Sequence, residues 1–122
     1  MLAPQLSPPA VFDVTATAHA SVITATGELD LAVTEHLETL LRQELRLAPA
    51  ALVFDVSAVT FCSARVLSIL LDAVAEATLT GVPFAVAGRC RALLRPIAVL
   101  HLDDLLPVHS STEEALLRLA GG

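Results

Sequence analysis

The spacing of hydrophobic residues predicts that the chain begins with two strands. Residues 11–15 and 20–26 are rich in β-branched side chains, which favour strands, and a short break at 18–19 joins them as a hairpin. The segment 27–30, Gly-Glu-Leu-Asp, is expected to interrupt the second strand. An antiparallel strand pair is therefore predicted ahead of the first helix.

Helical periodicity follows from residue 31 to residue 47. Asp30 precedes this stretch as a suitable N-cap, and Pro49 marks its end. Hydrophobic residues recur at helical spacing along one stripe, which consists of Val33, Leu37, Leu40, Leu41 and Leu45. Residues 51–56 then form a continuous apolar run with one acid, Asp55, which is typical of a strand buried on both faces.

The second half of the chain repeats the alternation of helix and strand. A helix is expected from Ser63 to about Leu79, with Gly81 after it as a stop. Its inward stripe is Val66, Ile69, Leu70, Ala73, Val74 and Ala77. Further expected elements are a strand at 82–87, a helix at 90–100 containing Pro96, an edge strand at 105–108 and a short helix after Ser111. The sequence predicts an α/β fold in which a mixed sheet of four to five strands packs with about four helices.

The length of 122 residues corresponds to one domain with one hydrophobic core. Because prolines gather near its start, the segment 1–10 is expected to be a flexible arm, and 11–120 a single domain. Hydrophobic residues make up 55% of the chain and charged residues 16%, a composition that excludes intrinsic disorder.

The charge balance excludes several kinds of partner. The chain has no lysine, and its 7 arginines stand against 13 acidic residues, giving a net charge of -6. A nucleic-acid-binding protein needs a basic surface to neutralise phosphates, and an acidic surface repels anionic membranes. The longest uncharged stretch, from Val14 to Gly27, is shorter than the roughly 20 apolar residues of a membrane-spanning helix. We therefore expect no nucleic-acid partner and no membrane partner.

The residue types that most often carry chemistry lack the necessary spacing. Cys62 and Cys90 form neither a disulfide framework nor a metal site, and reduced thiols favour a cytoplasmic location. The four histidines are isolated, and the glycines are too scattered for a phosphate-binding loop. No enzyme activity, metal or cofactor is expected. The local cluster of Arg89, Arg91 and Arg95 is interpreted as a solvated face or, alternatively, as a docking site for an acidic partner.

Two expected strand-to-helix junctions carry a family pattern. Residues 26–30 read Thr-Gly-Glu-Leu-Asp, and residues 54–63 read Phe-Asp-Val-Ser-Ala-Val-Thr-Phe-Cys-Ser. Together they resemble the STAS domain, the fold of bacterial anti-sigma-factor antagonists, and the order of elements matches from about Val11 to Leu119. The resemblance implies a protein that binds an anti-sigma factor to regulate transcription.

The resemblance also implies a phosphorylation switch, whose usual acceptor this chain lacks. In such antagonists the second segment continues with Asp or Ser, an acceptor Ser, a Ser or Thr, a Gly and a Leu. The anti-sigma factor, itself a serine kinase, phosphorylates the acceptor, and the phosphorylated antagonist no longer binds it. Here Ser63 and Leu67 match, whereas Ala64, Arg65 and Val66 replace the acceptor, the Ser or Thr and the Gly. Because Ala64 has no hydroxyl, the switch is expected to be absent.

The three replacements change the expected surface. A phosphate adds about -1.5 to -2 charges, which a helix N-terminus tolerates but an interface fitted to a neutral hydroxyl does not. Arg65 places a cation where the helix dipole disfavours it, and Val66 adds a branched side chain where a partner's backbone can otherwise approach. The phosphorylation surface is therefore expected to be lost or remade. The resemblance implies these partner-binding residues: Glu28, Asp30, Cys62, Ser63, Ala64, Arg65, Val66 and Leu67.

Several alternatives remain open at this point. Ser63 is a weak candidate for a displaced phosphate acceptor, and its other expected role is the N-cap of the following helix. Asp30 is expected mainly as a cap, Glu28 is either solvated or near the partner, and Asp55 is expected to satisfy loop amides. The alternative functions are a STAS scaffold or ligand-binding subunit of a signalling or lipid-transport assembly and, more distantly, an unrelated small α/β enzyme. A homodimer is also possible.

Overall fold

Five strands form one mixed sheet in the computed structural model, which describes residues 10–120. The strands are β1 (Val11–Ala16), β2 (Ser21–Leu29), β3 (Leu52–Cys62), β4 (Phe84–Ala87) and β5 (Val108–His109), and they lie in this order across the sheet. β1 is antiparallel to β2, and all other neighbouring strands are parallel. The helices found within the described residues are α1 (Leu31–Arg46), α2 (Ala64–Thr80), α3 (Arg91–Val99) and α4 (Thr112–Ala120). The predicted α/β fold with a mixed sheet is confirmed.

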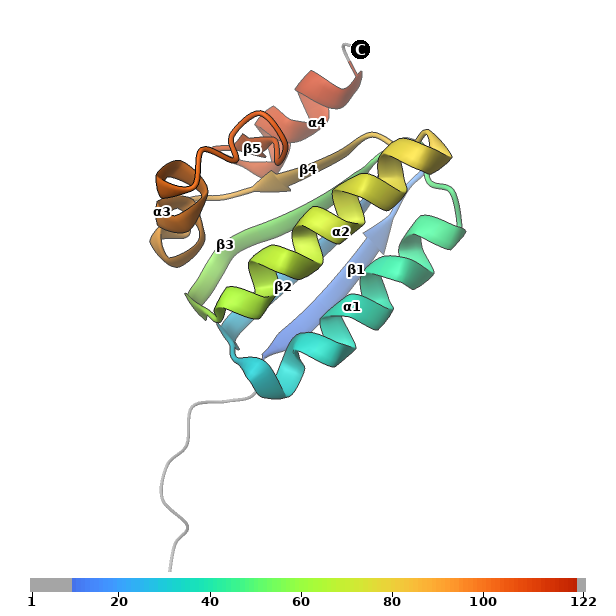
Figure 1. Ribbon diagram of the computed structural model, residues 1–122. Coiled ribbons are helices and arrows are strands. Elements are labelled where there is room, and N and C mark those ends of the chain that lie inside the picture. The colour runs from blue at the N-terminus through green and yellow to red at the C-terminus, as the bar shows by residue number, and fades with distance from the viewer. Residues whose placement is uncertain (1–9, 121–122) are drawn as a thin grey trace, which may run out of the picture.

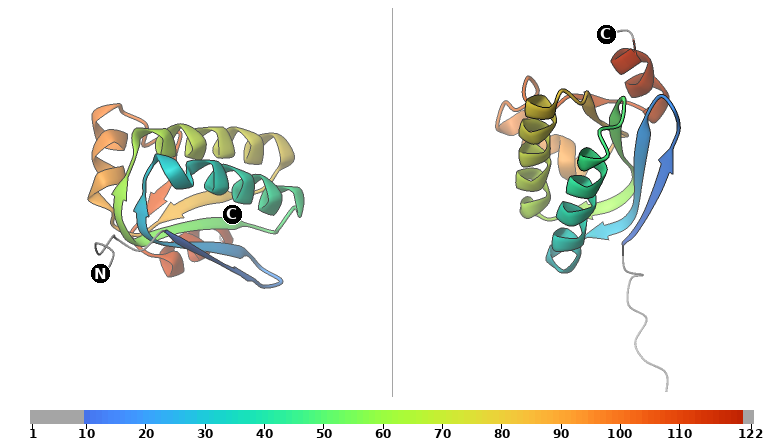
Figure 2. Two further views of the ribbon diagram at one scale, coloured as in Figure 1. Left: turned by 90° about the horizontal axis from the view of Figure 1, so that it is seen from below. Right: turned by 90° about the vertical axis from the view of Figure 1, so that its right-hand side faces the viewer.

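The helices divide into two layers around the sheet. α1 and α2 lie side by side on one face, and α4 covers part of the opposite face (Figures 1 and 2). The central strand β3 is buried on both faces, as its apolar run predicts, because Phe54 belongs to the main core and Val53 to a smaller cluster with Ala115 of α4. The main core lies under α1, α2 and α3 and includes Ile23, Leu37, Leu41, Leu52, Leu70, Val86 and Leu93.

Two strands extend further than their sequence predicts. β2 continues through Gly27 to Leu29, where an interruption was expected, and β3 continues to Cys62. The pairing of the two strands shifts register between Gly27 and Glu28, and Gly27 has a positive φ of 102°. A bulge with glycine at this position absorbs the irregularity without ending the strand. Both strands therefore run to the same edge of the sheet, where α1 and α2 begin.

Smaller differences concern the C-terminal half. β5 is limited to Val108–His109, because Leu105 and Leu106 belong to a turn in which both N–H groups donate to the Leu102 carbonyl. The helix around Pro96 forms as predicted but is short, spanning Arg91–Val99. The flexible arm predicted for residues 1–10 lies, apart from Ala10, outside the described residues. A search of residues 10–120 for a helix able to cross a membrane finds none.

Candidate partner-binding site

Two strand-to-helix junctions meet at one edge of the sheet, where β2 leads into α1 and β3 leads into α2 (Figure 1). Leu29 pairs with Cys62, and the Ser63 N–H donates a 2.8 Å hydrogen bond to the Leu29 carbonyl. We name this region, residues 28–31 together with residues 61–66, the tip. The fold thus joins in one place the two segments that carry the family pattern.

The first junction is fixed by a helix cap. The Asp30 Oδ1 atom accepts a 3.0 Å hydrogen bond from the Ala32 N–H, and the Asp30 carbonyl accepts one of 3.2 Å from the Val33 N–H. The predicted capping role of Asp30 is confirmed. Glu28 lies half-buried at the end of β2. A contact of either side chain with a partner stays a prediction.

The second junction presents a side chain without a hydroxyl. Ala64 is the first residue of α2 and is exposed. Ser63 takes the N-cap position with extended backbone (φ -71°, ψ 159°), but its side chain makes no capping hydrogen bond. The Ser63 Oγ atom is buried and has no hydrogen-bond partner. Ser63 is therefore the N-cap residue, as predicted, but its buried side chain does not supply the capping hydrogen bond.

Arg65 carries the cationic charge of the tip. Its Nη2 atom lies 3.5 Å from Oε2 of Glu38 on α1, and the same carboxylate oxygen lies 3.7 Å from Nη2 of Arg42. All three side chains keep contact with solvent, so these ion pairs contribute at most about 1 kcal/mol each. The pairing nevertheless joins the first turn of α2 to the middle of α1 and compensates the unfavourable position of a cation at a helix start.

The next two residues lie in the protein interior. Val66 is fully buried and Leu67 is nearly so, and both belong to the main core. This confirms the inward helical stripe predicted from the sequence. It overturns the view that the Val66 side chain stands where a partner's backbone would approach, because that side chain packs beneath the tip instead. For Leu67, likewise, a direct side-chain contact with a partner does not fit its burial.

Cys62, at the end of β3, is half-buried beside Cys90, the N-cap residue of α3. Burial raises the pKa of the Cys62 thiol to about 12, and the neighbouring Cys90 thiol adds to this shift. A thiol with so high a pKa stays protonated at neutral pH and is a poor nucleophile. The two thiols are free, so Cys62 acts as a packed side chain that joins the tip to the start of α3.

Two exposed apolar side chains at the tip were missed from the sequence. Phe61 on β3 is 48% exposed, and Leu31, the first residue of α1, is 71% exposed. Large apolar side chains that face solvent at one place are typical of surfaces that bind other proteins. The available signal was position: Phe61 lies within the second family segment and Leu31 directly follows the first, each near a strand or helix end where no core contact is required.

The acidic, histidine and cysteine side chains of the described residues form no metal site. Within residues 10–120, no group of three or more His, Cys, Asp and Glu side chains gathers as metal ligands would. Asp55 instead accepts hydrogen bonds from the Ser57 N–H (2.8 Å), the Ser57 hydroxyl and the Thr112 hydroxyl (2.7 Å). It satisfies a backbone amide, but this amide lies within β3 and not in the predicted loop, because β3 continues to Cys62. The tip therefore combines exposed apolar side chains, Phe61 and Leu31, with one cation, Arg65, and two acids, Glu28 and Asp30.

Comparison with known proteins decides the family. Residues 12–107 match the family described as Mlab, STAS domain. The anti-sigma-F factor antagonist RsfB of Mycobacterium tuberculosis is 34% identical over 102 residues, which cover 84% of this chain and 83% of RsfB. The chain belongs to the STAS domain family.

The fold supports this membership independently. The crystal structure of an anti-sigma factor antagonist from Mycobacterium paratuberculosis superposes with a TM-score of 0.79 and 30% identity, covering 94% of this chain and 99% of that one. A putative anti-sigma factor antagonist from Thermotoga maritima has a TM-score of 0.81 at 14% identity, covering 89% and 94% of the two chains, and so shares the fold. The STAS arrangement is thus retained although the sequence has diverged widely.

STAS family membership gives the tip its interpretation. The motif aligned in the sequence places the usual phosphate acceptor at residue 64, and the structure shows an exposed alanine there, at the start of α2. Which residues of the tip contact a partner stays a prediction. The strongest candidates are those whose side chains are accessible, namely Asp30, Leu31, Phe61, Ala64 and Arg65.

Proposed function

We propose that this protein is an anti-sigma-factor antagonist that binds an anti-sigma factor of the serine-kinase type through the tip. The observation that carries the proposal is the 34% identity with the antagonist RsfB over most of both chains. The similarity of the fold to an antagonist of Mycobacterium paratuberculosis, at 30% identity, supports it. Partner binding would release a sigma factor and so regulate transcription.

We further propose that the protein is not switched off by phosphorylation. The exposed residue at the acceptor position, Ala64, has no oxygen atom to modify. The adjacent hydroxyl of Ser63 is buried, so a kinase cannot reach its Oγ atom unless the start of α2 opens. The tip then gains no phosphate charge in the presence of ATP and kinase.

This action requires binding and no catalysis by the antagonist itself. STAS antagonists are regulatory proteins, and the described residues hold no group of three or more His, Cys, Asp and Glu side chains that could bind a metal ion. The two unpaired cysteines fit a reducing compartment, so we place the action in the cytoplasm.

A charge placed at residue 64 tests the proposed interface. In the Ala64→Glu variant a carboxylate enters the tip, where the helix dipole favours it and folding is preserved. The control is Ala75→Glu, which makes the same change at an exposed position of the same helix, about 16 Å further along its axis.

By calorimetric titration with the purified kinase-type anti-sigma factor of the source organism, Ala64→Glu should lose at least about 100-fold in affinity, because the carboxylate becomes a buried unpaired charge. Ala75→Glu should stay within about twofold of the unmodified protein, since a solvated surface charge contributes little. If the two variants lose affinity equally, residue 64 does not lie in the interface. If the unmodified protein does not bind the anti-sigma factor, the proposed antagonist function is wrong.

The absence of a switch is tested with ATP in the same mixture. After incubation with the anti-sigma factor and ATP, the intact mass of the unmodified protein should not change. A gain of one phosphoryl group that peptide mapping places on Ser63 would show that the buried hydroxyl is the acceptor after all.

A further inference from the structure

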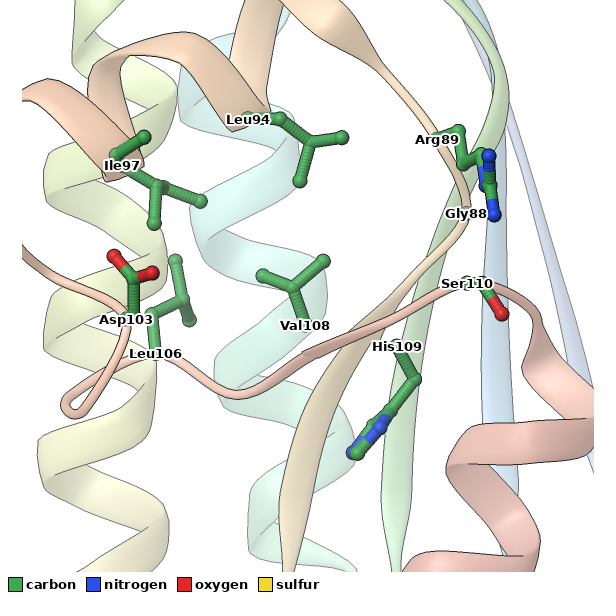
Figure 3. Close-up of a pocket in the computed structure, with 10 residues that line it drawn as sticks. Gly88, Arg89, Leu94, Ile97, Asp103, Leu106, Val108, His109 and Ser110 are labelled. Carbon is green, nitrogen blue, oxygen red and sulfur yellow. The ribbon is translucent and has the colours of Figure 1, made fainter.

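A cleft beside α3 combines apolar walls with arginines at one end. The cleft has a volume of about 380 Å³ and lies between α3 and the segment that leads into β5. Leu94 and Ile97 of α3 face Leu106 and Val108 across it (Figure 3). We name this space the α3 cleft. Its volume and its mainly apolar lining are within the range of sites that hold small molecules.

The polar groups of the α3 cleft are separated by charge. Arg89 and Ser110 line one end, and Asp103 lies at the opposite end (Figure 3). The ring of His109 points away from the space, and its Nδ1 atom lies 3.4 Å from Glu114 Oε1. The Ser110 hydroxyl donates a 2.9 Å hydrogen bond to Glu114 Oε2, so the group at this end that remains for a bound molecule is the cation of Arg89.

The positive charge extends beyond Arg89. A second surface hollow shares Arg89 and Leu94 with the α3 cleft and is also lined by Arg91 and Arg95. All three arginines are exposed, and within residues 10–120 none of them forms an ion pair. In a protein with a net charge of -6, three arginines within seven residues concentrate the scarce cations at one place.

The start of α3 adds to this positive field. α3 spans nine residues, and its first turn contains Arg91 and no acidic side chain. The positive end of a helix dipole normally favours an anion and disfavours a cation. Two arginines next to an uncompensated helix start therefore leave a field that a bound anion would neutralise.

The location agrees with the general geometry of α/β folds. Gly88 and Arg89 directly follow β4, and Ser110 directly follows β5, so this end of the cleft lies at the carboxyl ends of two parallel strands. Ligands of open α/β sheets bind at this edge. From the charge, the apolar walls and the position together, we propose that the α3 cleft binds a small amphipathic anion, with its acidic group at Arg89 and its apolar body between Leu94 and Val108. This inference does not depend on the proposed anti-sigma partner.

Two fluorescent probes test separately whether the α3 cleft binds an apolar body and whether it binds an anionic group. Anilinonaphthalene sulfonate carries an anionic group on an apolar body, and N-phenylnaphthylamine has nearly the same body without the charge. The protein should bind the sulfonate saturably at one site and about tenfold more tightly than the neutral probe, since a charge-assisted hydrogen bond to arginine adds to apolar burial. Equal affinity for the two probes, or no saturable binding of the sulfonate, would overturn the proposal.

Matched variants locate the probe. Arg89→Gln should weaken sulfonate binding about fivefold and leave the neutral probe unaffected, whereas Arg46→Gln, the same change at an exposed site on α1, should stay within about twofold. Ala98→Phe fills the cleft from an exposed position of α3 and should abolish binding of both probes, while Ala75→Phe on α2 serves as its control. Equal loss in Arg89→Gln and Arg46→Gln, or unchanged binding in Ala98→Phe, would show that the probe binds elsewhere and the proposal is wrong.

Discussion

The Thr112 hydroxyl donates a 2.7 Å hydrogen bond to Oδ2 of Asp55, a residue 57 positions earlier in the chain. The other oxygen of this carboxylate accepts from the N–H and hydroxyl of Ser57. Asp55 lies on the central strand β3 and Thr112 is the first residue of α4. Because α4 covers its face of the sheet with the small cluster around Ala115, this bond is a principal polar attachment of the C-terminal helix.

Removing the hydroxyl of Thr112 should loosen this attachment. Thr112→Val keeps the shape of the side chain and leaves a partly buried carboxylate oxygen without its partner, so we expect a loss of about 1–2 kcal/mol in the free energy of unfolding. Urea denaturation measures it. The control is Thr39→Val at an exposed position of α1, which should change stability by less than about 0.5 kcal/mol. Equal effects of the two variants would contradict the role assigned to the bond.

The same network predicts a dependence of stability on acid. Burial raises the pKa of the Asp55 carboxyl, but the hydrogen bonds from Ser57 and Thr112 outweigh burial, and the pKa is lowered overall. A carboxyl with a lowered pKa in the folded state stabilises the protein above its unfolded pKa of about 3.9 and loses this contribution as the pH falls further. The difference in unfolding free energy between the unmodified protein and Asp55→Asn should therefore shrink from pH 6 to pH 3. A difference that stays constant over this range would count against the assignment.

Two glycines with positive φ should differ sharply in their tolerance of alanine. At Gly88 (φ 103°) an added Cβ would lie 2.6 Å from the Ser57 backbone nitrogen, because β4 passes close to β3 there. At Gly81 (φ 75°) no atom lies within 4 Å of the added Cβ. Gly81→Ala should cost only the backbone strain of about 1 kcal/mol, whereas Gly88→Ala should cost more than about 3 kcal/mol. Thermal or urea unfolding measures both, and a similar cost at the two sites would refute the close approach.

The local elements of this fold are predictable from sequence because local signals specify them. The helical stripe that includes Val66 and Leu70, the cap at Asp30 and the apolar run around Phe54 each depend on residues within a few positions of one another. The same stripe shows why the expected partner contact of the Val66 side chain was wrong. The motif indicates only which family position Val66 occupies, whereas the helical period indicates that its side chain faces the core.

Features that join distant segments were not predictable in the same way. The bulge at Gly27 depends on how β2 pairs with β3. In the sequence, a strand that contains a bulge and a strand that ends there show the same break in the pattern of side chains. The neighbouring positions of Cys62 and Cys90, and the inward side chain of Ser63, likewise arise only when α2 and α3 pack on the sheet. The α3 cleft adds apolar walls at Leu106 and Val108 to an arginine cluster that the sequence shows only as a local run of charge.

The Cys62 thiol should react slowly with alkylating agents. Its pKa of about 12, caused first by burial and then by the Cys90 thiol, leaves almost no thiolate at pH 8. Iodoacetamide should therefore modify Cys62 about 10³-fold more slowly than free cysteine, whose thiol has a pKa of about 8.5. The rate should still be rising tenfold per pH unit at pH 10, and peptide mapping distinguishes Cys62 from Cys90. A rate that levels off near pH 9 would show that the thiol is not shielded.

Restoring the hydroxyl at the acceptor position should restore phosphorylation. In Ala64→Ser the new side chain stands at the exposed first residue of α2, where the helix N-terminus stabilises an added phosphate. Neither neighbour blocks this position from within the fold, because Val66 is buried in the core and the Arg65 guanidinium lies 3.5 Å from a Glu38 oxygen. With the kinase-type anti-sigma factor and ATP, Ala64→Ser should gain one phosphoryl group at residue 64 and then bind the kinase more weakly.

The matched variant Ala75→Ser, at another exposed position of the same helix, should gain no phosphoryl group. Retained binding of Ala64→Ser without phosphate transfer would mean that the Arg65 replacement has remade the surface, so that the partner docks without bringing its γ-phosphate to residue 64. In that case the double variant Ala64→Ser with Arg65→Ser, which returns a small hydroxyl side chain to the second position as well, should recover the modification. Failure of the double variant would show that the loss of the switch does not lie in these two side chains.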